Sequence, residues 1–136
     1  MKALCFDLGL GNSVRFLGFV DDVPGLLGAV DLCVFSSKAE GVPNGVLEAM
    51  AAGLAVAAID DPSIREALGP EGDPWLAPPG DPDALAALIL DLAAHPETRE
   101  RLGDANRERI QAEFSVRAMC EQTSSLIERA LSEAKE

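Results

Sequence analysis

Residues 32–53 read LCVFSSKAEGVPNGVLEAMAAG, and this stretch decides the fold. The apolar run 32–35 predicts a buried strand, and the polar, glycine-rich residues after it predict a loop. Residues 46–52 have the apolar spacing of a short helix, which Gly53 ends. A strand, a loop and a helix in this order are typical of a parallel sheet covered by helices.

The rest of the chain repeats this alternation. Short strands are predicted at 14–17, 55–59 and 75–77, and helices at 2–9, about 22–28, 63–68, 82–94, 97–112 and 115–133. We expect an α/β fold with a parallel sheet flanked by helices, in a single domain over residues 1–136 whose C-terminal helices occupy about 97–133. Ligands bind such sheets at the carboxyl ends of the strands, so the loops 18–22, 36–45 and 60–64 should line one crevice.

Two carboxylates lie in the deciding stretch, Glu40 in the loop and Glu48 inside the helix, with seven residues between them. An ionised carboxylate accepts hydrogen bonds only, and its two oxygens can take two neighbouring hydroxyls, such as those of a ribose. Glu40 could do the same for a second polyol. The alternative is a solvent-exposed loop acid and a helix-start Glu that favours the helix dipole.

The backbone around the helix start offers a second set of contacts. Unpaired N–H groups there can receive an anion or sugar hydroxyls. Gly41 and Gly45 would let a ligand approach the backbone closely, Pro43 suits a first helical turn, and Asn44 could cap the helix.

Composition excludes several kinds of partner. The net charge is −12 and the 11 basic residues form no dense cluster, which argues against nucleic acid and anionic membranes. Cys5, Cys33 and Cys120 are predicted to be buried, reduced thiols, as in a cytoplasmic protein. No apolar run approaches the 18 residues that a membrane-spanning helix needs. No His–Cys cluster has the spacing of a metal site, and we expect neither a metal nor a cofactor.

Two polar features of the C-terminal half have plain interpretations. His95, before Pro96, is predicted to be a solvent-facing residue at a helix end. The arginines of the next helix alternate with glutamates, which indicates a solvated helix face with ion pairs four residues apart; they are Arg99, Arg101, Arg107 and Arg109.

The segment Glu40-Gly41-Val42-Pro43, followed by Glu48-Ala49-Met50-Ala51-Ala52-Gly53, resembles the E-x7-E signature of retaining GT-B glycosyltransferases of family 4, the group 1 transferases. The resemblance covers nearly the whole chain, and its segments occur in the family's order. The further matching segments are Val14–Gly18, Ala29–Ser37, Ala55–Ile59, Pro79–Leu85 and Glu113–Ser115.

This resemblance implies a Rossmann-like, donor-binding domain of a two-domain enzyme that needs no metal. Glu48 would bind the ribose of a nucleotide-sugar donor, and Glu40 would lie at the donor sugar as the catalytic residue. The backbone of Gly41, Val42, Pro43 and Asn44 would contact the sugar and the diphosphate. Phe19 and Val20 would lie near the base.

The chain also departs from the family pattern. The N-terminal, acceptor-binding domain and the first strands of the C-terminal domain, which carry an Arg and a Lys for the diphosphate, are expected to be missing. We therefore expect a donor-binding half that is inactive alone, with a free strand edge that a homodimer or a swapped oligomer could cover. Asp60 and Asp61 replace a glycine pair and should repel a diphosphate.

Three functions remain open at this point. The first is a retaining hexosyltransferase half that binds a UDP- or GDP-sugar, in the cytoplasm or at the inner face of the membrane. The second is a non-catalytic α/β module that binds no nucleotide. The third, a GT-B epimerase, is disfavoured because its signature residues are not evident. The base, the sugar and the acceptor cannot be inferred from the residues.

Overall fold

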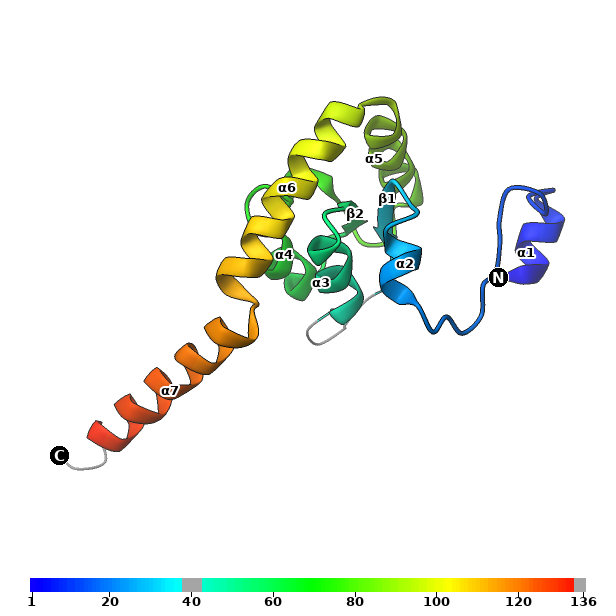
Figure 1. The fold of residues 1–136 in the computed structure, drawn as a ribbon. Coiled ribbons are helices and arrows are strands. Elements are labelled where there is room, and N and C mark those ends of the chain that lie inside the picture. The colour runs from blue at the N-terminus through cyan, green and yellow to red at the C-terminus, as the bar shows by residue number, and fades with distance from the viewer. Residues whose placement is uncertain (38–42, 134–136) are drawn as a thin grey trace.

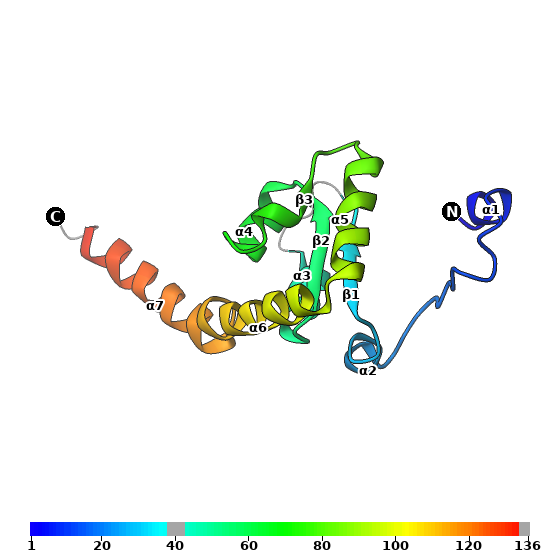
Figure 2. The ribbon, with the colours of Figure 1, turned by 90° about the horizontal axis from the view of Figure 1, so that it is seen from above.

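The computed structural model describes residues 1–37 and 43–133. Its sheet has three parallel strands in the order β1 (Leu32–Phe35), β2 (Ala55–Ile59) and β3 (Leu76–Ala77). Figure 1 shows the fold, and Figure 2 labels the three strands. Leu32 pairs with Ala55 and Ile59 pairs with Ala77. All five residues of β2 are buried, because β2 has a strand on each edge and helices on both faces. The predicted α/β parallel sheet is confirmed.

The helices divide between the two faces of the sheet. On one face, α3 (Asn44–Ala51) and α4 (Pro62–Leu68) pack on Val56 and Ala58, with Met50 and Ile64 fully buried. On the other face, α5 (Pro82–Ala94) packs on Ala55 and Ala57 through Leu92. The residues that face the two sides of the sheet alternate along β2, which is the period of two expected of a strand. One short strand therefore contributes side chains to two hydrophobic cores.

The connecting and terminal elements complete the chain. They are α1 (Lys2–Asp7), α2 (Val23–Leu27), the short 3-10 helix η1 (Asp73–Trp75), α6 (Pro96–Glu113) and α7 (Val116–Glu133). Helix α6 crosses the body, whereas α1 and α7 project away from it at opposite ends in both views (Figure 2). Neither α1 nor α7 contains a buried residue.

Three helices begin directly after an aspartate that caps their N-terminus. The side chains of Asp22, Asp61 and Asp81 accept hydrogen bonds from the backbone N–H groups of Gly25, Ser63 and Ala84, at 2.9, 3.0 and 2.9 Å. Each of these bonds satisfies an N–H that has no partner within the helix. A proline follows each cap in the first turn, where its missing N–H has no cost.

Three sequence predictions are wrong. Residues 14–17 form no strand and find no partner strand among the described residues, and isolated strands are not stable without one. Asn44 does not cap α3, because Pro43 occupies the N-cap position and Asn44 is the first helical residue. Cys120 is exposed on α7, while Cys5 and Cys33 are half-buried, all three as free thiols.

The predicted pairing four residues apart is present between Arg109 and Glu113, at 2.6 Å, but the arginines of α6 do more than form a solvated face. Three of them donate to backbone carbonyls at the C-terminal ends of other helices: Arg99 to Leu92 and Ala93 of α5, Arg107 to Ala52 after α3, and Arg109 to Glu66 and Ala67 of α4. The last carbonyls of a helix generally lack partners within that helix; the Leu92 carbonyl accepts from the N–H of the C-cap residue His95 as well, at 3.4 Å. Helix α6 therefore holds the ends of three helices in place.

Candidate functional site

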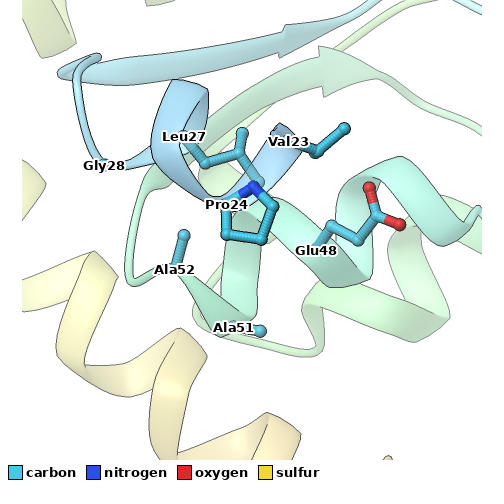
Figure 3. A pocket seen from close by; sticks show the side chains of 7 residues that line it. All are labelled: Val23, Pro24, Leu27, Gly28, Glu48, Ala51 and Ala52. Atoms are coloured by element: carbon cyan, nitrogen blue, oxygen red, sulfur yellow. The ribbon is translucent and has the colours of Figure 1, made fainter. Parts of the chain in front are cut away.

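A pocket of about 500 Å³ lies between α2 and α3 (Figure 3). Apolar side chains dominate the described lining, in which Glu48 supplies the one carboxylate. Its lining residues are Val23, Pro24, Leu27, Gly28, Glu48, Ala51 and Ala52. Ligand pockets typically combine an apolar lining with a few placed polar groups, and they span about 300–1,000 Å³.

The α2 wall of the pocket depends on local chemistry. The Asp22 cap and Pro24 fix the start of this five-residue helix. Leu27 packs against the core cluster that contains Val46 and Met50, so α2 is attached to the body next to α3. In Figure 3 the side chains of Pro24 and Leu27 face the α3 wall.

The α3 wall places Glu48. The helix buries Val46, Ala49 and Met50 against the sheet, and Glu48 lies on its exposed side. In Figure 3 its carboxylate lies at the end of the pocket nearest Val23. Among the ion pairs formed by the described residues, none includes Glu48. Its oxygens are therefore accessible acceptors for a ligand's hydroxyls.

The other predicted site residues lie in different surroundings. Glu40, Gly41 and Val42 lie outside the described residues. Pro43 is buried, and its carbonyl oxygen accepts from the N–H groups of Val46 and Leu47 at 2.8 and 3.1 Å. Pro43 has no N–H to offer a ligand. Asn44 is exposed at the first position of α3.

Two further expectations concern the approach of a ligand to this region. Phe19 is 90% exposed and Val20 is half-buried, and neither lines the pocket. At Gly45 the space that a Cβ would take is occupied by the Phe35 ring, 2.9 Å away, so this glycine serves helix–strand packing. The loop 18–22 does not follow a strand, and residues 60–64 do not line this pocket. Because residues 38–42 lie outside the described residues, the crevice expected between the three loops stays a prediction.

The acids after β2 are engaged locally. Asp60 forms an ion pair with Arg65 at 2.8 Å, and Arg65 also pairs with Asp73. The hydrogen bond that Arg65 donates to Asp60, with the charges of the Asp60 and Asp73 carboxylates, raises the pKa of Arg65 further above its usual range. Asp61 caps α4 and accepts from the Ser63 hydroxyl at 2.6 Å. Asp60 is thus partly neutralised by its own neighbour.

Sequence reasoning found Glu48 but missed most of the pocket. Val23, Pro24 and Leu27 belong to a helix that the sequence predicted, yet nothing in the spacing indicates that this helix packs beside α3. Within residues 1–37 and 43–133, no group of three His, Cys, Asp or Glu side chains could hold a metal ion. None of the helices in that part of the chain is long and apolar enough to cross a membrane.

The order of parallel strands and covering helices defines an α/β protein of the Rossmann-like class found in GT-B proteins. The chain belongs to the family described as glycosyl transferases group 1, whose family model matches residues 1–109. This confirms the resemblance to the group 1 glycosyltransferases.

Solved and curated proteins agree with this family. Sucrose-phosphate synthase from Thermosynechococcus elongatus superposes with a TM-score of 0.82 at 30% identity, over 97% of this chain and 34% of that one. The amylovoran biosynthesis glycosyltransferase AmsK of Erwinia amylovora is 29% identical over 95% of this chain and 34% of its own length. An MMP alpha-(1->4)-mannosyltransferase of Mycolicibacterium hassiacum is 30% identical over 96% of this chain and 32% of its own. The chain spans about a third of the length of the relatives it matches.

Proposed function

We propose that this chain is the donor-binding part of a retaining hexosyltransferase, and that it binds a nucleotide-diphosphate sugar in the pocket between α2 and α3. The observation that supports this most is the position of Glu48, the second glutamate of the E-x7-E segment, on the wall of an apolar pocket. Membership of the family does not by itself indicate which pocket binds the donor, and the pocket does not by itself indicate which ligand it binds. The position of Glu48 links the two.

The pocket suits a nucleoside in particular. The Glu48 carboxylate would accept hydrogen bonds from the two ribose hydroxyls, while Val23, Pro24 and Leu27 offer an apolar surface to the base. Phe19 and Val20 precede α2 and stay predicted base contacts. The described lining residues include no cation, so on their part affinity for the nucleoside would come from hydrogen bonds and apolar contact rather than from attraction to the phosphates.

The reacting end of the donor is assigned by resemblance. Glu40 would lie at the sugar, and Gly41, Val42, Pro43 and Asn44 would surround the sugar and the diphosphate. Transfer with retention would proceed at the front face of the sugar, with the leaving diphosphate assisting the incoming acceptor hydroxyl. Stabilisation of the charge that develops on this leaving group would then be the largest catalytic effect. A mannosyltransferase and a sucrose-phosphate synthase are among the similar proteins, and this favours a hexose as the donor sugar.

A binding titration tests the proposal. UDP- and GDP-sugars are titrated by calorimetry into the chain, into Glu48→Gln and into the control Glu100→Gln, which removes an exposed carboxylate from α6 instead. Loss of charged hydrogen bonds should weaken binding in Glu48→Gln by about ten- to a hundredfold, and the control should match the parent. A folded chain that binds neither donor would favour the alternative, a non-catalytic α/β module.

Two finer expectations belong to the same proposal. Strand β1 pairs only with β2 among the described strands, so its other edge is the predicted place for a homodimer or a swapped oligomer. Sedimentation over a range of concentrations measures this, and a monomer at all concentrations would contradict it. A cytoplasmic location, with activity at the inner face of the membrane, is the expected setting for a nucleotide-sugar donor and is testable by cell fractionation.

A further inference from the structure

Helix α6 contacts the turn between α3 and β2 through three residues, Gly103, Asn106 and Arg107, which we call the α6 contact. The turn consists of Ala52, Gly53 and Leu54, and each of its residues has a partner in the α6 contact. Gly53 has a φ of +76°, a value that favours glycine, so the turn itself is a specialised one.

Each part of the α6 contact is close. A Cβ on Gly103 would lie 2.1 Å from the Gly53 carbonyl oxygen, so the two backbones touch. The buried Asn106 amide donates to the Leu54 carbonyl at 2.8 Å. The Arg107 guanidinium lies against Gly53 and donates to the Ala52 carbonyl at 2.9 Å.

The turn is also part of the candidate donor pocket. Ala52 lines the pocket together with Ala51, and the N–H of Ala52 donates to the Glu48 carbonyl at 3.0 Å. A chain of two hydrogen bonds thus leads from Arg107 through the Ala52 peptide groups to the backbone of Glu48. Any shift of the last turn of α3 would move the Glu48 carboxylate relative to the α2 wall, because a helix moves as a rigid element.

We propose that Arg107 is a positioning residue for the Glu48 carboxylate: by fixing the end of α3 it sets the distance between that carboxylate and the α2 side of the pocket. This rests on the proposed function of the pocket as a donor site. Asp104, one turn earlier on α6, forms an ion pair with Arg107 at 3.2 Å and so orients its guanidinium. Arg107 is not among the described residues that line the pocket, and it meets the pocket wall through the Ala52 carbonyl.

The same helix supplies a matched control. Arg109 donates to the carbonyls of Ala67 and Glu66, at the end of α4, both at 2.8 Å. The chemistry is that of Arg107, an α6 guanidinium on the end of another helix, but α4 contributes nothing to the lining of the pocket. A purely structural role predicts that the two arginines behave alike in a binding assay, whereas a positioning role predicts that they differ.

The experiment compares Arg107→Gln, Arg109→Gln and the double variant Glu48→Gln/Arg107→Gln, each by donor titration and by thermal unfolding. Titrations are made well below every unfolding midpoint, with whichever of UDP-glucose, UDP-GlcNAc, GDP-mannose or GDP-glucose the parent chain binds. We expect Arg107→Gln to raise the donor Kd by about two- to thirtyfold and Arg109→Gln to leave it unchanged. Both variants should unfold at lower temperature than the parent.

The double variant shows whether Arg107 acts through Glu48. When Glu48→Gln is already present, Arg107→Gln should add little, because the group that it positions has been removed. Equal effects of Arg107→Gln and Arg109→Gln, or fully additive effects in the double variant, would overturn the proposal. If Arg107→Gln does not fold, Arg107→Lys replaces it, since a lysine keeps a donor but loses the planar fork, and the same comparisons apply.

Failure of this inference is distinct from failure of the proposed function. If the parent binds donor and Glu48→Gln does not, the pocket is established whatever Arg107 does. If the parent binds none of the four donors, both proposals fall together, and the α6 contact is then only a structural one.

Discussion

Helices α6 and α7 are consecutive and both have 18 residues, but they relate to the body in opposite ways. Helix α6 is rich in charged residues, and yet it buries Leu102, Gly103 and Asn106. Helix α7 has an apolar side and buries nothing; its exposed large apolar residues are Val116, Met119, Leu126, Ile127 and Leu131. Helix α6 joins the body through an apolar core residue, Leu102, together with glycine and polar contacts, whereas the apolar side of α7 packs on none of the described elements of the body.

The same substitution in both helices gives the largest contrast. Leu102 is 3% exposed in a core cluster with Leu92, whereas Leu126 is 59% exposed. Leu102→Ala should lower the free energy of unfolding by about 3 kcal/mol, because it leaves a cavity. Leu126→Ala should change it by less than about 0.5 kcal/mol. Urea unfolding of both variants measures the difference, and similar losses would show that α7 is packed in solution.

Gly103→Ala sharpens the comparison at the closest approach of α6 to the body. Alanine favours a helix over glycine by about 1 kcal/mol, so an unpacked helix would gain stability. Here the new methyl group would meet the Gly53 carbonyl oxygen, and we expect a net loss of about 2 kcal/mol. Ser124→Ala on the exposed α7 is the control and should be neutral. A stabilised Gly103→Ala variant, measured by thermal unfolding, would contradict the close contact.

Asn106→Ala tests the polar part of the same contact. The substitution leaves the Leu54 carbonyl without its donor next to the buried strand β2. We expect a loss of about 1.5 kcal/mol, typical of a buried group left unsatisfied. Gln122→Ala on α7 removes an amide from an exposed position and should have almost no effect. Equal unfolding midpoints for the two variants would mean that the Asn106 amide stabilises nothing.

The smallest expected effect is a pH dependence at the start of α6. Nδ1 of His95 lies 2.9 Å from the Asp91 carbonyl oxygen and 3.0 Å from its carboxylate. The hydrogen bond to the Asp91 backbone, followed by the Asp91 charge, raises the pKa of His95. The pKa of His95 is raised in the folded state only. The stability that protonated His95 contributes is therefore complete at pH values below the pKa of the unfolded state. It is lost as pH rises through the pKa of the folded state.

Unfolding midpoints should therefore fall slightly between about pH 6 and pH 8, around the ordinary histidine pKa. The His95→Gln variant cannot titrate there, and its midpoint should lack this part of the slope. Identical slopes in the parent and the variant would show that the Asp91 contact does not persist in solution.

The parts of the fold that sequence predicts best have a local cause. Helix α5 was predicted at its observed bounds because Asp81 caps it and Pro96 follows it. The strand predicted at 14–17 is wrong because a strand is stable only when it pairs with another strand. The sequence pattern of the segment does not show whether a partner strand is present. The α6 arginines were misjudged for a similar reason, since their carbonyl partners lie 6 to 55 residues away along the chain.

The candidate site divides in the same way. Glu48 could be predicted from its spacing and its exposed helical position, and the structure places it on a pocket wall. The opposite wall, at Val23, Pro24 and Leu27, depends on the packing of α2 beside α3. Cys120 and Asn44 show the limits of rules that consider one residue at a time. Cys120 is exposed because α7 does not pack on the body, and Asn44 is not the cap of α3 because Pro43 occupies the N-cap position.

The sheet has the same strand order in space as along the chain, β1-β2-β3. During synthesis each new strand can therefore add to one that has already left the ribosome, without waiting for a later segment. The hydrogen bond from Arg107 to the Ala52 carbonyl does not follow this sequential order, because it joins residues that are 55 positions apart along the chain. This bond at the end of α3 can accordingly form only after the chain has grown past residue 107, so a ribosome-bound nascent chain that ends earlier would carry the sheet and the buried face of α3 but not the bond that joins α3 to α6.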